Sequence, residues 1–211
     1  MVEKVIINPK EQSFKENHKL MIGSIVPRPI ALVSTISKGS VKNLAPFSYF
    51  NGVCSKPPTI MFAPARRGWD GKEKDTLKNI KETKEFSINL VSESFVEQMI
   101  ACSTDFDPDI DEFDISKLTP LSSKKIKPPI VKESKISFEC ILNKIVPVGN
   151  KEAGAGFIVI GEIILFHIDD EIVSNGHIDL NTFNPIGRLA GNFYTRPTNN
   201  FEIYRKIKPG K

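Results

Sequence analysis

Residues 27–34 read PRPIALVS and residues 43–50 read NLAPFSYF, and these two stretches indicate the type of fold. The apolar run at 30–35 is rich in β-branched side chains and is followed by a Ser-Lys-Gly turn, which predicts a short buried strand. The second stretch places aromatic rings and hydrogen-bonding side chains around Pro46. Because proline has no amide hydrogen, Pro46 is expected to break regular sheet pairing and leave neighbouring amides free.

The rest of the chain contains more strand-like than helix-like patterns. Apolar and polar residues alternate over 86–91, which predicts a half-buried strand. Three further runs are predicted as strands, at residues 59–63, 135–146 and 156–168. Helical spacing predicts helices over 75–83 and 94–102, the second opened by a capping box of Ser94 and Glu97. Many short strands with few helices predict a mainly β, α+β domain built as a barrel.

Composition and charge narrow the class of protein. With 211 residues, 40% hydrophobic and 26% charged, the chain is expected to form one compact domain over residues 1–211. The small net charge of +4 is spread along the chain and argues against nucleic-acid binding. No apolar run has the length of a membrane span, and residues 1–10 lack the apolar core of a signal peptide. Three widely spaced cysteines without such a signal favour a reducing, cytoplasmic location.

Residues 43–50 carry groups that suit a flat aromatic ligand with carbonyl oxygens along one edge. Amides around residues 45–48 and the side chains of Asn43 and Ser48 offer a line of donors. Such donors match the N1–C2=O edge of a flavin ring and stabilise the negative charge that reduction builds there. An irregular edge strand whose polar side chains only complete a turn would give the same pattern.

Residues 74–76, KDT, lie at the predicted start of a helix. A helix N-terminus leaves amides unpaired and attracts phosphate, and Lys74 and Thr76 add a cation and a hydroxyl. Asp75 is expected as the N-cap, or as an acceptor for amides or a ribityl hydroxyl. Arg66 and Arg67 offer further phosphate contacts. With the ring-binding pattern, these residues predict a flavin mononucleotide (FMN) site; a capped surface helix beside a solvent-facing lysine is the alternative.

Other site chemistries match the sequence poorly. There is no GxGxxG, P-loop or GxSxG motif, and three scattered histidines have no metal-ligand spacing. The absence of an evident axial ligand also argues against haem. The acidic stretch within residues 103–129 resembles a calcium loop only loosely, because Ile110 stands where an EF-hand needs glycine. A solvated acidic lid is the preferred interpretation of this stretch.

The order PRPIALVST, NLAPFSYF, KDTLKNIKETKEFSINLV and a late GRLAGNFY resembles the flavin reductase-like family, and more narrowly its flavoredoxin-type FMN-binding proteins. The resemblance covers about residues 20–195 and implies a split β-barrel with a few peripheral helices. It implies a homodimer with FMN near the subunit interface. It also implies that electrons pass from NAD(P)H, or from a ferredoxin-like or other protein donor, through FMN to flavin or another acceptor. The alternative is a flavoredoxin-like electron carrier with no small-molecule turnover of its own.

The resemblance also assigns residues to the expected site. Those that would line the ring and the ribityl chain are Asn43, Ala45, Pro46, Phe47 and Ser48. Those expected nearer the ribityl chain and phosphate are Thr35, Lys74, Asp75 and Thr76, with Arg28 added from the PRP motif. Arg66 is added to this set because its positive charge suits a phosphate contact. No catalytic residue is expected, because hydride transfer to flavin N5 depends mainly on stacking geometry and a tuned potential. Residues 188–194 would lie near the pocket entrance.

Overall fold

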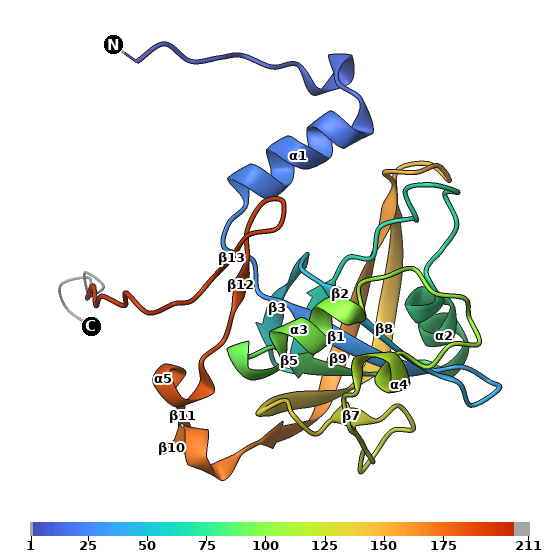
Figure 1. Cartoon of the computed structure of the whole chain (residues 1–211), viewed down its shortest axis with the longest axis vertical. Coiled ribbons are helices and arrows are strands. Elements are labelled where there is room, and N and C mark those ends of the chain that lie inside the picture. Colours follow the sequence, from blue (N-terminus) through green and yellow to red (C-terminus); the bar gives the residue numbers. More distant parts are fainter. Residues whose placement is uncertain (1, 205–211) are drawn as a thin grey trace.

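The computed structural model describes residues 2–204 and has an antiparallel sheet of seven strands at its centre (Figure 1). The strands are β1 (Ala31–Ile36), β2 (Lys42–Phe47), β3 (Phe50–Ser55), β4 (Pro58–Phe62), β5 (Glu85–Leu90), β8 (Ile136–Val148) and β9 (Gly156–Ile168). Their order in the sheet is β2-β1-β5-β8-β9-β4-β3. The predicted mainly β, α+β class is therefore confirmed, and each predicted strand lies within two residues of an observed one.

Short elements surround this sheet. Three two-stranded pairs are formed by β6 (Pro120–Leu121) with β7 (Ile130–Val131), β10 (Val173–Ser174) with β11 (His177–Ile178), and β12 (Gly187–Arg188) with β13 (Tyr194–Thr195). The α-helices are α1 (Phe14–Ser24), α2 (Asp75–Thr83), α3 (Val96–Ala101), α4 (Glu112–Ser116) and α5 (Leu180–Phe183). Within residues 2–204, no helix combines the length and the apolar character that a bilayer span requires.

The connection between β2 and β3 shows that the sheet curls on itself. These two strands are the opposite edges of the sheet, yet only Ser48 and Tyr49 separate them in sequence. The edges must therefore approach each other, and the rings of Phe47 on β2 and Phe62 on β4 lie 5.1 Å apart between centroids. A sheet whose edges meet without pairing is an opened barrel.

Apolar side chains fill the inside of this curved sheet. Phe62 and Phe86 pack with ring centroids 5.6 Å apart, and Leu77 and Ile80 of α2 close the same cluster. A second cluster lies on the outer face of β1 and β2, where Leu32 and Leu44 pack with residues of α3 and α4. Helices on both sides therefore hold β1 and β2 in place.

Pro46 does not break the pairing of β2, so that sequence prediction was wrong. β2 pairs with β1 to its last residue, with Pro46 opposite Leu32. The amide of Leu44 donates to Glu112 Oε2 at 3.0 Å, away from β1, and Pro46 has the same orientation because it lies two residues further along the strand. β2 is an edge strand, so the missing amide hydrogen falls on the unpaired edge and costs no sheet hydrogen bond.

Two predicted helices exist, but their caps differ from the prediction. The first has the predicted bounds, yet its N-cap residue is Lys74, and Asp75 is the first helical residue, with its carboxylate 2.8 Å from the Lys78 ammonium. The second begins only at Val96, after a 3-10 turn over Glu93–Phe95. Its predicted capping box does not form, because Ser94 Oγ lies within that turn, 2.9 Å from Ser92 Oγ.

Candidate functional site

Three cavities meet around Pro46, one residue before the end of β2. The α2 cavity, of about 70 Å³, lies between β2, the start of α2 and residues 102–106. The α1 cavity, of about 260 Å³, extends from Pro46 toward α1 and the segment after β4. The α3 cavity, of about 160 Å³, lies between Pro46, α3 and the β12–β13 hairpin. Each is small, but together they surround one continuous stretch of chain.

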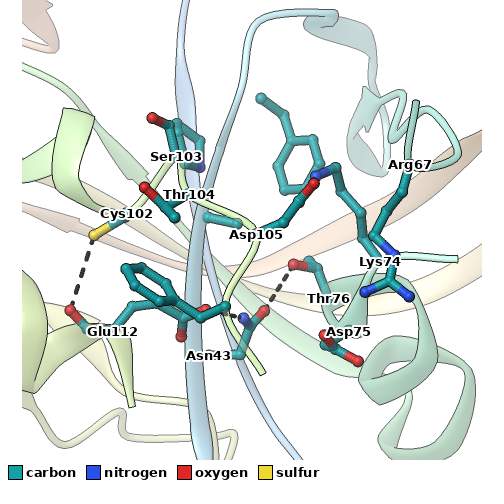
Figure 2. Close-up of a pocket in the computed structure, with 14 residues that line it drawn as sticks. Asn43, Arg67, Lys74, Asp75, Thr76, Cys102, Ser103, Thr104, Asp105 and Glu112 are labelled. Atoms are coloured by element: carbon teal, nitrogen blue, oxygen red, sulfur yellow. Dashed lines mark hydrogen bonds and ion pairs between the residues drawn. The ribbon is translucent and has the colours of Figure 1, made fainter. Parts of the chain in front are cut away.

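The structure brings most of the predicted site residues to these cavities. The α2 cavity is lined by Asn43, Ala45, Pro46 and Phe47 of β2 and by Lys74, Asp75 and Thr76 (Figure 2). Ser48 and Arg28 line the α1 cavity. Thr35 lies behind Asn43, fully buried, and Arg66 lies outside all three linings.

Asn43 connects parts of the site that are far apart in sequence. Its Oδ1 accepts hydrogen bonds from Thr76 Oγ1 at 2.7 Å and from Thr35 Oγ1 at 3.3 Å, and its Nδ2 donates to Glu112 Oε1 at 2.7 Å. Asn79 Nδ2 donates in turn to Thr35 Oγ1 at 3.1 Å. These bonds join β1, β2, α2 and α4, so the amide of Asn43 has a fixed orientation at the cavity wall.

Glu112 is a site residue that sequence reasoning missed. It is 6% exposed, and its carboxylate accepts from Asn43 and from the amide of Leu44. Burial, with a smaller contribution from Asp111, raises the pKa of Glu112. Asp111 itself pairs with Lys42 of β2. The acidic stretch is therefore not simply a solvated lid, because α4 binds it to the sheet edge. A buried role could have been suspected from the apolar Phe113 beside Glu112.

Lys74 has a carboxylate partner that the sequence did not reveal. Its Nζ lies 2.6 Å from Asp105 Oδ1, with both side chains about one-third exposed (Figure 2). The amides of Asp75 and Thr76, at the start of α2, have no hydrogen-bond partner among residues 2–204. The start of α2 thus offers two free amide donors and the Lys74 ammonium. In this structure the ammonium forms an ion pair with Asp105.

Arg28 joins three parts of the fold. It is 4% exposed, and its guanidinium donates to the carbonyls of Ile22 at 2.8 Å and Leu189 at 3.0 Å, and to Ser48 Oγ at 3.3 Å. This arginine links α1, the end of β2 and the β12–β13 hairpin. Its position next to Ser48 fixes the wall of the α1 cavity, with little donor capacity left for a ligand.

The free amides of the β2 end are fewer than the sequence suggested. The Leu44 amide points away from β1, so the amides of Ala45 and Phe47 point toward β1, where they are available only for sheet pairing. The amides of Ser48 and Tyr49 have no partner among residues 2–204. These two donors lie between the edge strands, at the border of the α1 cavity.

The two neighbouring arginines, Arg66 and Arg67, bind to groups of the glycine-rich loop that follows them. Arg66 donates to the carbonyl of Gly71 at 3.0 Å and lies over the Phe157 ring. Arg67, which lines the α2 cavity, pairs with Asp70 at 2.7 Å. Neither guanidinium is poised for phosphate in this arrangement.

Comparison with known proteins identifies relatives of the whole fold. The family model described as flavin reductase like domain matches residues 22–183. Nitrilotriacetate monooxygenase component B from Bacillus cereus is 37% identical, with a TM-score of 0.92 over 96% of this chain and 100% of that one. The 2-nitrobenzoate 2-nitroreductase NbaA from Pseudomonas fluorescens is 30% identical, with a TM-score of 0.84 over 96% of both chains. A putative flavin reductase with a split barrel domain from Shewanella frigidimarina, 22% identical with a TM-score of 0.80 over 93% of this chain and 96% of that one, has the same fold.

Proposed function

The chain belongs to the flavin reductase-like family, and we propose that it binds FMN and transfers electrons from NAD(P)H through the flavin to free flavin or another small acceptor. The family model is described by flavin reductase chemistry, and two relatives of at least 30% identity are described as a monooxygenase component and a nitroreductase, which supports a redox function. One observation carries the proposal: groups suited to bind a phosphate and groups suited to bind a flavin ring line adjacent cavities that meet at Pro46.

The start of α2 is the proposed phosphate site. The free amides of Asp75 and Thr76 and the Lys74 ammonium converge there, at the positive end of a helix of nine residues. The Thr76 hydroxyl donates to Asn43 Oδ1 and so links this site to β2. A phosphate bound at this position would replace Asp105 as the partner of Lys74. Asp75 would then face ribityl hydroxyls rather than the phosphate, because its carboxylate is acceptor-only.

The end of β2 is the proposed ring site. Pro46 and Phe47 offer apolar surface, and the free amides of Ser48 and Tyr49 offer donors for the carbonyl edge of the ring. Asn43 Nδ2 donates one hydrogen to Glu112 and has a second for the ligand. We propose supporting roles for the remaining predicted residues: Thr35 orients Asn43, Arg28 holds Ser48, and Arg66 braces the loop that precedes Lys74.

Bound FMN would supply hydride and single-electron transfer at this site. The chain contributes binding, orientation and polarisation: donors at the ring edge favour the reduced, more negative flavin. No side chain among those lining the cavities is required as an acid or base in this proposal, so none is assigned one.

Enzymatic turnover and simple electron carriage are the two forms that this function can take. The similarity to a 2-nitrobenzoate 2-nitroreductase, at 30% identity over nearly the whole chain, favours an enzyme with a small acceptor. A carrier would hold FMN equally well but exchange electrons with a ferredoxin-like protein. We also propose a homodimer, since β3 is an edge strand with five of six residues exposed and α1 buries none of its residues.

The test begins with the absorption spectrum of the untreated protein and of protein passed over gel filtration after addition of FMN. We expect a retained flavin spectrum; a protein that stays colourless contradicts the proposal. Steady consumption of NADH or NADPH with added FMN would identify an enzyme. Reduction by a ferredoxin-like donor, with negligible nicotinamide turnover, would identify a carrier.

A further inference from the structure

Arg188 lies where two of the three cavities meet. It is the second residue of β12 and lines both the α1 cavity and the α3 cavity. Its backbone pairs with that of Arg28, with N–O distances of 2.8 and 3.0 Å, so the position of its Cα is fixed relative to the end of β2. Its side chain is therefore held next to Pro46 and Ser48, which line the same two cavities.

The guanidinium of Arg188 has most of its donors free. It lies over the Tyr194 ring at 4.5 Å, and its Nη1 donates to the carbonyl of Phe193 at 3.2 Å. No carboxylate pairs with it among residues 2–204, whereas Arg66, Arg67 and Arg196 each have one. A guanidinium carries five donors in a planar fork, so the side facing the cavities has unused bidentate capacity.

The surroundings of Arg188 are positive. Within residues 2–204, no aspartate or glutamate lines the α1 or the α3 cavity. His18 and Lys74 also line the α1 cavity, but Lys74 is already paired with Asp105. In the same cavity wall, the hydroxyl of Tyr49 is buried without a hydrogen-bond partner among the described residues. A cavity with free donors and no acidic residue concentrates anions.

We propose that Arg188 anchors the anionic group of a second, planar aromatic ligand that binds beside FMN. This inference rests on the proposed FMN site and names the class of its second substrate. A flavin ring on Pro46 and Ser48 fills one of the two cavities, and the other remains for the electron donor or acceptor. Arg188 borders both cavities, so it faces the second ligand in either arrangement. Its fork matches a carboxylate or a phosphate bidentately.

Two sources supply such an anionic group: the phosphates of NAD(P)H, or the carboxylate of an aromatic acceptor. The test uses FMN-loaded protein and pairs each anionic probe with a neutral one. For the donor, NADH is compared with N-benzyl-1,4-dihydronicotinamide, which carries no phosphate. For the acceptor, benzoate is compared with benzamide as a ligand that perturbs the flavin spectrum. Each probe is measured with wild-type protein, Arg188→Met and Arg188→Lys.

We expect Arg188→Met to raise the KM for NADH or the Kd for benzoate by about tenfold to a hundredfold, the loss typical of a charge-assisted bidentate contact. Arg188→Lys should recover part of this loss, because it keeps the charge but not the fork. The neutral probes and the Kd for FMN should stay within about twofold of wild type. The matched control is Arg196→Met, which removes an arginine that pairs with Glu93 and lines neither cavity.

The pattern of losses identifies the source of the anion. A loss confined to NADH assigns Arg188 to the donor phosphates, and a loss confined to benzoate assigns it to an acceptor carboxylate. The proposal is overturned if neither anion responds, if the neutral probes weaken equally, or if FMN affinity falls with them. A wild-type protein that takes up no FMN would instead overturn the proposed function, and the role of Arg188 beside the flavin with it.

Discussion

Lys74 is the residue on which the phosphate argument depends. Its ammonium lies at the start of α2, beside the two free amides of Asp75 and Thr76. We expect Lys74→Ala to weaken FMN by about tenfold to a hundredfold, the value of a charge-assisted hydrogen bond. Riboflavin lacks the phosphate, so its affinity should change little. Quenching of flavin fluorescence measures both; an equal loss for the two ligands would place Lys74 away from the phosphate.

Asp105 competes with phosphate for the same lysine. Because both side chains of the Lys74–Asp105 pair are partly exposed, the pair is worth at most about 1 kcal/mol. We therefore expect Asp105→Asn to tighten FMN binding by at most about fivefold. Asp109→Asn is the matched control, since it removes the same charge from the same segment without a contact to Lys74. Weaker FMN binding in Asp105→Asn would mean that Asp105 supports the ligand instead.

Glu112 makes stability depend on pH. Burial raises its folded-state pKa above the unfolded value of about 4.3, so the unfolded chain releases this proton first as the pH rises. The contribution of Glu112 to stability is therefore lost as the pH rises from the unfolded pKa to the raised folded pKa, and is constant above it. We expect the unfolding free energy of wild type, relative to Glu112→Gln, to fall over that range. Urea denaturation of both proteins from about pH 4 to 8 measures this difference; a rising difference contradicts the sign.

At the scale of the elements, the features that depend on local pattern could be predicted from the sequence, and those that depend on long-range contacts could not. The alternation over residues 86–91 and the helical spacing after Lys74 located β5 and α2 because each depends only on near neighbours. Pro46 was misjudged, since its tolerance depends on β2 being an edge strand, which no local pattern shows. Asn43 was predicted, but its bond to Glu112 spans 69 residues. The sequence signals predicted residues that line the candidate cavities, and they missed the segment around Glu112 that holds Asn43 in place.

Close packing of β9 against β5 gives a prediction at this scale. A Cβ added to Gly161 of β9 would lie 2.3 Å from an atom of the Phe86 ring, inside the curved sheet. We expect Gly161→Ala to lower the unfolding free energy by about 1–3 kcal/mol, the usual cost of overpacking. Gly52→Ala on the exposed edge strand β3 is the control, because its Cβ meets nothing within 4 Å. Equal urea midpoints for the two variants would show that Phe86 moves aside without cost.

At the scale of the whole molecule, α1 has too little contact with the rest of its own chain to explain its apolar side chains. In Figure 1 the helix stands beyond the sheet, and none of its residues is buried. Met21 in the last turn of α1 and Ile25, its C-cap residue, are 48% and 52% exposed. Exposed apolar groups gathered on one element mark an interaction surface, and the proposed homodimer would cover this one.

Placing a charge on that surface tests the dimer. We expect wild-type protein to have twice the mass of one chain by light scattering, and Met21→Glu to shift it toward the monomer, because burying an unpaired carboxylate is costly. Lys15→Glu is the control, since it adds a carboxylate to an exposed lysine position on the same helix. His18 and Ile22 of α1 also line the α1 cavity, so loss of the dimer should loosen FMN as well. A Met21→Glu protein that remains dimeric with unchanged FMN affinity would show that α1 lies outside the subunit interface.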